Sequence, residues 1–555
     1  MKHKNIIMNF CLAIGILSIT SCSSDFLNVS PNDALQASDS YKTQKQIDQA
    51  ITGVYSDLRS ISNDEFLMLS EVRSDNAWSN PQTDGLREYS EIGTFRAGSE
   101  ITTFNAAWAD WYKVIMGANT VLENIPNIKF TNDAIKNQFQ GEAYFLRGWA
   151  YFELVRMFGN IPIIDKTMLP EEAKTVKQST AVDVYKNIIL PDMTKAESLL
   201  PLTAGLVNGD GGSASGVGRA DQMAAKALLG RIYMTMAGFP INDATAQDKA
   251  EIKLNDVINY SVANSNKFWA TDSTEWKKQW MSEYNNKYSI FAIQYRTGNT
   301  GNMAIFNFSP ALPPSYTAQR IFGNQIYVEK SLMYEFSKLN AAGKPDARAY
   351  NTTILTGYAG GEAGFTAAYS NLTQSLTLAN GTVVPNVLSN TMFYKYMNSK
   401  RKRTALGYGA VNIETAMKDY NDWPVNYPVI RLEDVQLMSA EILLNKYNNV
   451  SGAIAIVNKI RARAGATLVS TTLSTADALL AVKNERRVEL CGEGVRWFDL
   501  VRWGEWKKAI EDKFDRYPNT NVDKANIKAG RYLCPIPYNQ MIVEPGLYVQ
   551  NPDYN

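Results

Sequence analysis

The segment that most constrains the fold is residues 136–158, KNQFQGEAYFLRGWAYFELVRMF. Its large apolar side chains recur at helical spacing, and the small residues between them leave room for a second helix to approach closely. Gly159 and Pro162 follow and end the pattern. Such alternation is typical of stacked helix–turn–helix repeats, so the segment predicts a helical array. The large residues are Tyr144, Phe145, Trp149, Phe152 and Val155, and the small ones are Ala143, Gly148 and Ala150.

The same periodicity predicts helices over residues 43–60, 106–125, 219–237, 432–446 and 452–464. These segments are scattered and unequal, unlike a uniform tetratricopeptide array with a period of about 34 residues. We therefore predict a mainly α fold, a tetratricopeptide-like helical scaffold with long inserted loops and minor β elements.

The predicted insertions stand out by composition. Residues 204–218 are rich in Gly and Ser and predict a flexible loop. Residues 357–390 are rich in Gly, Ala, Thr and Asn, with a turn predicted at 380–382 between short β-prone runs. Residues 288–308 carry alternating aromatic runs around a Gly-Asn turn and predict a small β element. Loops on a rigid scaffold are where ligand contacts usually lie.

The start of the chain is typical of a signal peptide. Lys2 and Lys4 precede an apolar stretch over residues 6–19, which is shorter than the roughly 20 apolar residues of a membrane-spanning helix. Cys22 follows where cleavage is expected, and the polar residues 23–25 come next, an arrangement that resembles a bacterial lipobox. The alternative is an ordinary secretory signal with an incidental cysteine. We predict a lipoprotein signal peptide over 1–21, lipidation of Cys22, and a tether over 22–40.

Charge and histidine usage exclude several classes of function. Removing Lys2 and Lys4 with the signal peptide takes 56 basic residues to 54, against 55 acidic residues, so nothing in the charge favours binding to nucleic acid. The single histidine, His3, lies in the signal peptide. Its loss excludes Ser-His-Asp catalysis and histidine-ligated metals, whereas carboxylate-pair chemistry remains open. Cys491 and Cys534 could pair after export, but we favour two buried free thiols.

Six segments together, in order along the chain, resemble the starch-utilisation-system D family, also called SusD/RagB. They are FLNVSP at 26–31, the helix with its end at 141–162, YPVIRLEDVQLMSAEILLN at 427–445, VNKIRARAG at 457–465, ERRVELCGEGVRWFDLVRWG at 485–504, and the stretch from YLCPIPYNQM to QNPDY at 532–554.

This resemblance implies a non-catalytic protein held on the outer face of the outer membrane by the lipid on Cys22. It implies that the protein caps a SusC-like TonB-dependent β-barrel and delivers oligosaccharides or polysaccharide to it. We separately expect no cofactor and no metal. We expect an N-terminal helical half over 41–270 and a C-terminal half over 271–555, packed together as one globular unit.

The best local candidate for a ligand site is residues 71–85, EVRSDNAWSNPQTDG. Trp78 lies among polar residues and offers a ring that could stack on a sugar face. Arg73, Asp75 and Asn76 could supply donors and acceptors to neighbouring hydroxyls. The resemblance supports an aromatic ligand contact in this early loop. The alternative is that Trp78 anchors the loop on the scaffold. The spacing does not fit an EF-hand, so no calcium is expected.

A weaker candidate set lies between the two halves. It includes Tyr295, Tyr316 and Arg348, the last of which matches a recurring Asp-x-Arg of the family. Arg348 could equally be structural, as could Trp280, Tyr284, Arg320, Tyr394 and Tyr396. The dense charges over 485–502 are interpreted as a buried ion-pair network, not a site. They are Glu485, Arg486, Arg487, Glu489, Arg496, Asp499 and Arg502.

Three other functions remain open from the sequence. The same fold could deliver peptides, as the RagB side of the family suggests. A carboxylate-pair glycoside hydrolase is compatible with the missing histidines, although no short acid-pair signature stands out. A surface scaffold without a small ligand is the last alternative.

Overall fold

The computed structural model describes residues 41–554, with gaps at 62–66, 80–86, 211, 213–217, 282–285, 299–300, 303–325, 339, 344–345, 350–352, 356–375, 378–382, 385–390, 394, 397–421 and 518–521. The predictions for the signal peptide, the tether with Cys22, Tyr284, Tyr316, Arg320 and Tyr394 lie outside these residues.

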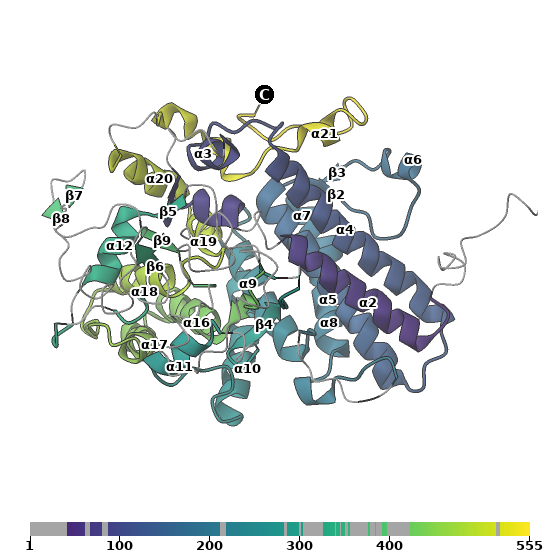
Figure 1. The fold of residues 1–555 in the computed structure, drawn as a ribbon, viewed down its shortest axis with the longest axis horizontal. Coiled ribbons are helices and arrows are strands. Elements are labelled where there is room, and N and C mark those ends of the chain that lie inside the picture. Colours follow the sequence, from purple (N-terminus) through teal and green to yellow (C-terminus); the bar gives the residue numbers. More distant parts are fainter. Residues whose placement is uncertain are drawn as a thin grey trace, which may run out of the picture.

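The first half of the chain is a stack of helices (Figure 1). Each long helix packs against the next one along the chain, so that α4 lies between α2 and α5, and α8 between α5 and α9. This nearest-neighbour packing is the property of helical repeats that the sequence predicted. The bounds are α2 Gln44–Ile61, α4 Thr102–Asn124, α5 Asp133–Phe158, α8 Leu190–Leu199, α9 Gln222–Ala237 and α10 Ala246–Ala263.

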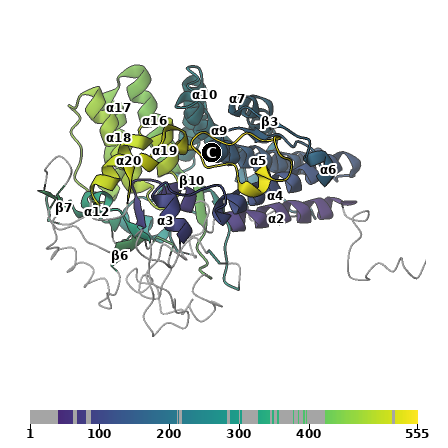
Figure 2. The ribbon, with the colours of Figure 1, turned by 90° about the horizontal axis from the view of Figure 1, so that it is seen from above.

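The second half continues the stack, because α16 packs against α10. Helices α16, α17 and α18 then contact one another and form the other end of the molecule, seen from above in Figure 2. Their bounds are Leu432–Tyr447, Val450–Arg463 and Thr475–Glu489. Shorter helices cover the ends and the connections: α3 Arg87–Gly93, α6 Pro170–Ala173, α7 Ala181–Val184, α11 Ser273–Lys278, α12 Lys330–Ser337, α19 Arg496–Arg502, α20 Trp506–Asp515 and α21 Tyr538–Met541.

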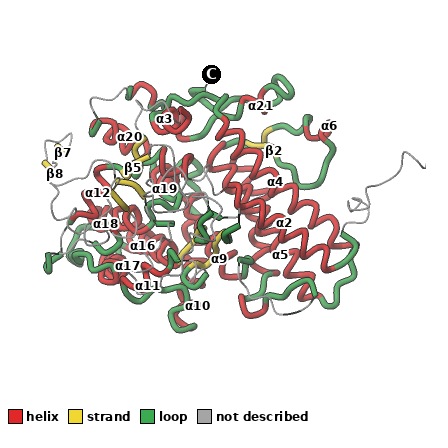
Figure 3. Tube along the Cα trace, in the orientation of Figure 1, coloured by secondary structure: helices red, strands yellow, loops and turns green. Residues whose placement is uncertain are grey.

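The strands are short compared with the helices (Figure 3). Those of the described residues form antiparallel pairs: β1 Ala77–Ser79 with β5 Ile326–Val328, β2 Ile161–Pro162 with β3 Gln178–Ser179, β4 Ser289–Ile293 with β10 Tyr427–Arg431, β6 Thr353–Leu355 with β9 Thr391–Phe393, and β7 Leu376–Thr377 with β8 Val383–Val384. The expected β element within 288–308 is β4, and β7 and β8 flank the predicted turn at 380–382. The mainly helical fold with minor β elements is thereby confirmed.

The predicted helices are all present, with ends shifted by a few residues. The small residues of α5 act as expected, since a Cβ on Gly148 would lie 3.0 Å from the Cγ of Met193 in α8. Helix α9 begins at Gln222 instead of 219. The cause is Asp221, whose carboxylate accepts a hydrogen bond from the backbone N–H of Ala224 at 2.8 Å and caps the helix there.

One large apolar cluster includes residues from both predicted halves. The ring of Phe291 in β4 meets Phe145 and Trp149 of α5 edge-on, at centroid distances of 5.0 and 5.6 Å. The boundary at 270 itself stays a prediction. Within the described residues, we find no helix with the length and hydropathy needed to span a bilayer.

The charges near the C-terminus form the predicted buried ion-pair network. Arg348 contacts Glu485 at 2.6 Å and Glu489 at 2.8 Å, and Arg502 contacts Glu441 at 2.6 Å. Because each guanidinium meets a carboxylate, the network joins α16, α18 and α19 without leaving isolated charges. Cys491 and Cys534 are buried free thiols, as favoured from the sequence.

Candidate functional site: a polar groove beside helix α2

A groove of about 350 Å³ lies beside the last turns of α2. Its walls come from three segments that are far apart in the sequence: the exposed side of α2, the residues just before α9, and the residues just after β4. The lining residues are Thr52, Tyr55, Ser56, Arg59, Gly218, Arg219, Gln294, Tyr295 and Arg296. They are hydroxyl, amide, guanidinium and phenol groups, so the groove is polar with aromatic edges.

The α2 wall follows from the amphipathic pattern of the helix. Thr52, Ser56 and Arg59 share one side because they are four and three residues apart. The opposite side carries Ile51 and Leu58, which are buried in the core. Arg59 lies over Ser56, donating from Nε to the Ser56 carbonyl at 3.3 Å. The hydrophobic face therefore orients the polar face toward the groove.

The β4 wall is held by a network of side-chain amides. Gln294 donates from Nε2 to the Oδ1 of Asn286 at 2.8 Å, and its Oε1 accepts from the Nδ2 of Asn426 at 2.7 Å. Asn426 also accepts from the backbone N–H of Tyr295 at 2.9 Å. The Tyr295 hydroxyl donates to the carbonyl of Arg59 at 3.1 Å and ties this wall to α2. These bonds fix the groove before any ligand binds.

Gly218 brings the third wall close. Its φ of 84° lies in the left-handed region that favours glycine. A Cβ at this position would lie 2.3 Å from the Cγ of Gln294, which is closer than any side chain tolerates. Only glycine therefore allows the segment before α9 to pass so near the end of β4.

Buried charge lies beneath the groove. Arg219 donates from Nη1 to both carboxylate oxygens of Glu142 at 2.9 Å, and it also pairs with Asp48. Burial raises the pKa of Glu142 despite this partner. Burial, together with the charge of Glu142, also raises the pKa of Tyr55 well above its usual value. The Tyr55 phenol therefore stays neutral, accepting a hydrogen bond from the N–H of Ala220 at 2.9 Å.

The lining limits the chemistry that the groove can perform. Its described residues include no Asp, Glu, Cys or Lys, so they provide neither a carboxylate pair nor a nucleophile with a base. In the part of the chain that the structure describes, no group of three His, Cys, Asp or Glu residues could hold a metal ion. The groups that are present can bind hydroxyl-rich molecules through guanidinium donors, amides and phenol rings.

The structure corrects the predicted position of Trp78. This residue belongs to β1, not to an open polar loop, and only 6% of its surface is exposed. Its ring stacks on Tyr517 with centroids 3.7 Å apart and an interplanar angle of 4°. The prediction of an exposed stacking platform at Trp78 is wrong in this structure, and the alternative of an anchor packed on the scaffold describes it.

The three polar neighbours of Trp78 are also buried, in contacts with the C-terminal part of the chain. Asp75 accepts two hydrogen bonds from Arg496 at 2.7 and 2.9 Å. Burial alone would raise the pKa of this carboxyl, but Arg487 and Arg496 together hold it well below its usual range. Arg73 donates to the carbonyls of residues 531 and 533, and Asn76 accepts from the Nε of Arg487 at 3.0 Å. Their polar groups join distant segments and do not face the groove.

The weaker candidates divide between the core and the groove. Arg348 is 1% exposed and pairs with Glu485 inside the ion-pair network, which agrees with the alternative that it is structural. Trp280 and Tyr396 pack edge-on in the core with centroids 5.6 Å apart. Tyr295 alone among the described candidates lines the groove.

Most of the groove residues were not predicted from the sequence. Thr52, Ser56 and Arg59 could have been found as a polar stripe along a predicted helix. Gln294 and Arg296 flank Tyr295 and carried no separate signal.

Glu71, close to the Trp78 segment, predicts a pH effect on stability. Its carboxylate is fully buried and accepts hydrogen bonds from Asn76 Nδ2 at 2.9 Å and from the N–H of Gly494 at 3.0 Å. Burial raises its pKa from 4.5 to about 7. Between these values the folded state keeps a proton that the unfolded state has lost, so this group makes stability fall as the pH rises from about 4.5 through 7.

We therefore expect Glu71→Gln to remove a pH-dependent loss of roughly 3 kcal/mol in the free energy of unfolding, since each pKa unit corresponds to about 1.4 kcal/mol. Urea unfolding at pH 5, 6, 7 and 8 measures this difference, with Glu172→Gln on exposed α6 as the matched control. Parallel pH profiles for the wild type and Glu71→Gln would contradict it.

Comparisons with known proteins all give one family. Residues 276–554 match the model of the SusD family, and residues 25–234 match a model described as "Starch-binding associating with outer membrane". The chain is similar to SusD-like protein P25 of Formosa agariphila, with 25% identity over 571 residues that cover 99% of this chain and 98% of the relative.

Solved structures share the fold. A SusD homolog from Bacteroides thetaiotaomicron superposes with a TM-score of 0.72 at 21% identity, covering 94% of this chain and 100% of the homolog. A laminarin-binding SusD-like protein superposes with a TM-score of 0.65 at 23% identity, covering 93% and 100% of the two chains.

Proposed function

Because this chain belongs to the SusD family, we propose that it captures an oligosaccharide or polysaccharide in the groove beside α2 without cleaving it. It then delivers this glycan to a SusC-like TonB-dependent transporter in the outer membrane. The lipid on Cys22 holds the protein on the outer face of that membrane. The observation that carries the proposal is the groove itself, whose guanidinium, amide and phenol groups are positioned by the fold.

The lining suits a sugar ligand through its hydrogen-bonding groups. A guanidinium offers a planar fork of donors that can bind two neighbouring hydroxyls at once. Arg59 lines the groove from α2, and Tyr295 and Arg296 line it from the segment after β4. Residues fixed by the amide network lose little freedom when a flexible glycan binds, which favours affinity.

The same lining supports capture without catalysis. Most glycoside hydrolases use two carboxyl groups, one on either side of the bond that is cleaved. The described lining has no carboxyl group, and Glu142 below it is occupied by Arg219. Released reducing ends during prolonged incubation with a bound glycan would contradict this part of the proposal.

We expect Arg59→Ala and Arg296→Ala each to weaken glycan binding by about tenfold, because each removes charge-assisted hydrogen bonds worth roughly 1.5 kcal/mol. Calorimetry of residues 23–555 against a panel of oligosaccharides, polysaccharides and peptides measures the effect. Arg96→Ala is the matched control, since Arg96 is also exposed but lies after α3 and outside the groove lining.

Two results would contradict the proposal. Glycan affinity that is unchanged in both variants would remove the groove as the site. Binding of peptides with no binding of any glycan would favour peptide delivery by the same fold. Equal unfolding midpoints in all three variants ensure that altered folding does not imitate either result.

A further inference from the structure

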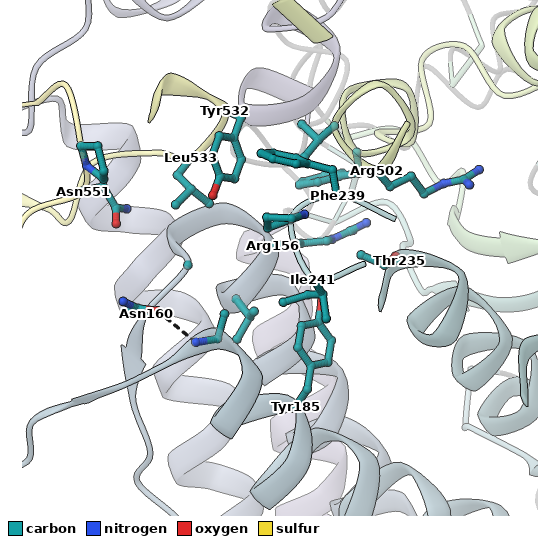
Figure 4. A pocket seen from close by; sticks show the side chains of 17 residues that line it. Arg156, Asn160, Tyr185, Thr235, Phe239, Ile241, Arg502, Tyr532, Leu533 and Asn551 are labelled. Atoms are coloured by element: carbon teal, nitrogen blue, oxygen red, sulfur yellow. Dashed lines mark hydrogen bonds between the residues drawn. The ribbon is translucent and has the colours of Figure 1, made fainter. Parts of the chain in front are cut away.

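A second pocket, of about 260 Å³, lies where the last turns of α5 and α9 meet α19 and the C-terminal segment (Figure 4). It shares no lining residue with the groove. The proposed glycan capture gives this pocket no role. It reaches the surface beside Asn160 and Pro552, which are both exposed. The walls are mostly rings and branched aliphatic chains, among them Val155, Tyr185, Phe239, Ile241, Phe498 and Tyr532.

The walls of the pocket are preformed. Phe239 and Tyr532 meet edge-on with centroids 4.9 Å apart. The guanidinium of Arg156 lies 3.7 Å from the ring centroid of Phe498 and covers its face. A pocket with such fixed aromatic walls needs little rearrangement to accept a flat ring.

The charges at the pocket are already matched. Arg156 donates from Nε to Glu153 at 2.6 Å. Arg502 lines the pocket but directs its guanidinium to Glu441, with contacts of 2.6 and 2.7 Å. Because each of these guanidiniums has a carboxylate partner, the pocket favours a neutral ligand over an anion or a cation.

Tyr185 places a polar group at the pocket. Tyr185 is 3% exposed, and its hydroxyl makes no hydrogen bond with the residues that the structure describes. In Figure 4 the side chain of Tyr185 points toward Ile241. Burial raises the pKa of this phenol, so it remains a neutral donor at physiological pH. This hydroxyl is therefore available to a ligand in the pocket as a donor and an acceptor.

The size and lining distinguish between occupants. An apolar cavity of about 150 Å³ is enough to bind benzene, so this pocket has room for a substituted ring. A sugar would bury several hydroxyls against apolar walls and leave most of them unpaired.

We propose that this pocket binds a neutral molecule with one aromatic ring and one hydroxyl, a simple phenol or aromatic alcohol. The ring packs among Phe239, Ile241 and Phe498, and the hydroxyl exchanges a hydrogen bond with Tyr185. The site is separate from the groove, so a test of this proposal does not depend on whether the groove binds glycans.

Fluorine NMR with 4-fluorophenol and fluorobenzene tests this inference on residues 23–555, because the two probes differ only by the hydroxyl. We expect saturable binding of both, tighter for 4-fluorophenol. Tyr185→Phe removes only the phenol oxygen, and we expect it to weaken 4-fluorophenol about tenfold while fluorobenzene changes less than about twofold. Tyr538→Phe is the matched control at an exposed tyrosine.

A filling variant keeps the test decisive if Tyr185→Phe perturbs the fold. Ile241→Trp places an indole in the pocket, and we expect it to abolish binding of both probes. The proposal is overturned if neither probe binds saturably, if Tyr185→Phe weakens both probes equally, or if Ile241→Trp leaves binding unchanged.

Discussion

Replacing Glu489 by alanine is expected to lower the free energy of unfolding by about 3–5 kcal/mol, the cost of leaving buried charges without their partner. Its carboxylate, which is fully buried, accepts hydrogen bonds from Arg348 at 2.8 Å, Arg463 at 2.7 Å and the indole of Trp276 at 2.9 Å. Burial opposes its ionisation, but the three arginines around it, with Arg431 as the third, hold its pKa well below the usual range. Equilibrium unfolding in urea at pH 7 measures the loss.

Glu172→Ala provides the comparison for Glu489→Ala. Glu172 lies on exposed α6 and its nearest cation, Lys166, is 3.7 Å away with both side chains more than half exposed. Such a surface pair contributes about 0–1 kcal/mol. A loss for Glu489→Ala as small as that of Glu172→Ala would mean that the buried network does not stabilise the C-terminal half.

Trp78→Ala is expected to cost about 3–5 kcal/mol of stability, because it removes a buried indole and leaves a cavity against Tyr517. Glycan affinity of the folded protein should change less than about twofold, since Trp78 does not line the groove. Urea unfolding and calorimetry on the same preparation separate the two effects. Unchanged stability with a loss of glycan binding would restore Trp78 as the stacking platform predicted from the sequence.

The helical scaffold could be predicted because its signal is local. The aromatic stripe and the small residues of α5 lie within one segment, and α5 forms over almost the residues expected. The exact positions of the helix ends could not be predicted from this pattern alone. At Asp221, for example, one capping side chain decides where α9 begins. Periodicity reports which face is buried, but it does not report which residue caps a helix.

The site could not be predicted to the same extent because it depends on contacts between distant segments. Trp78 looked exposed because Arg73, Asp75 and Asn76 are polar. Their partners, such as Arg487 and Arg496, lie more than 400 positions away and bury them. Polar composition therefore did not indicate a surface loop.

The groove residues were also hard to predict because they come from segments that are far apart in the sequence. Arg59 and Tyr295 meet because β4 packs beside α2, with 236 positions between them. Tyr295 was a reasonable candidate as an aromatic in loop-rich sequence, but nothing local connected it to the polar stripe of α2. The ion-pair network was easier to predict from the sequence. Its charges of both signs are concentrated over 485–502, and such density suggests ion pairs.

The most direct test of glycan capture in the groove is a crystal structure of residues 23–555 with the oligosaccharide that binds most tightly in calorimetry. We expect an intact oligosaccharide between α2 and β4, with hydroxyls bonded to Arg59 and Arg296. An oligosaccharide bound elsewhere, or present only as cleavage products, would contradict the account.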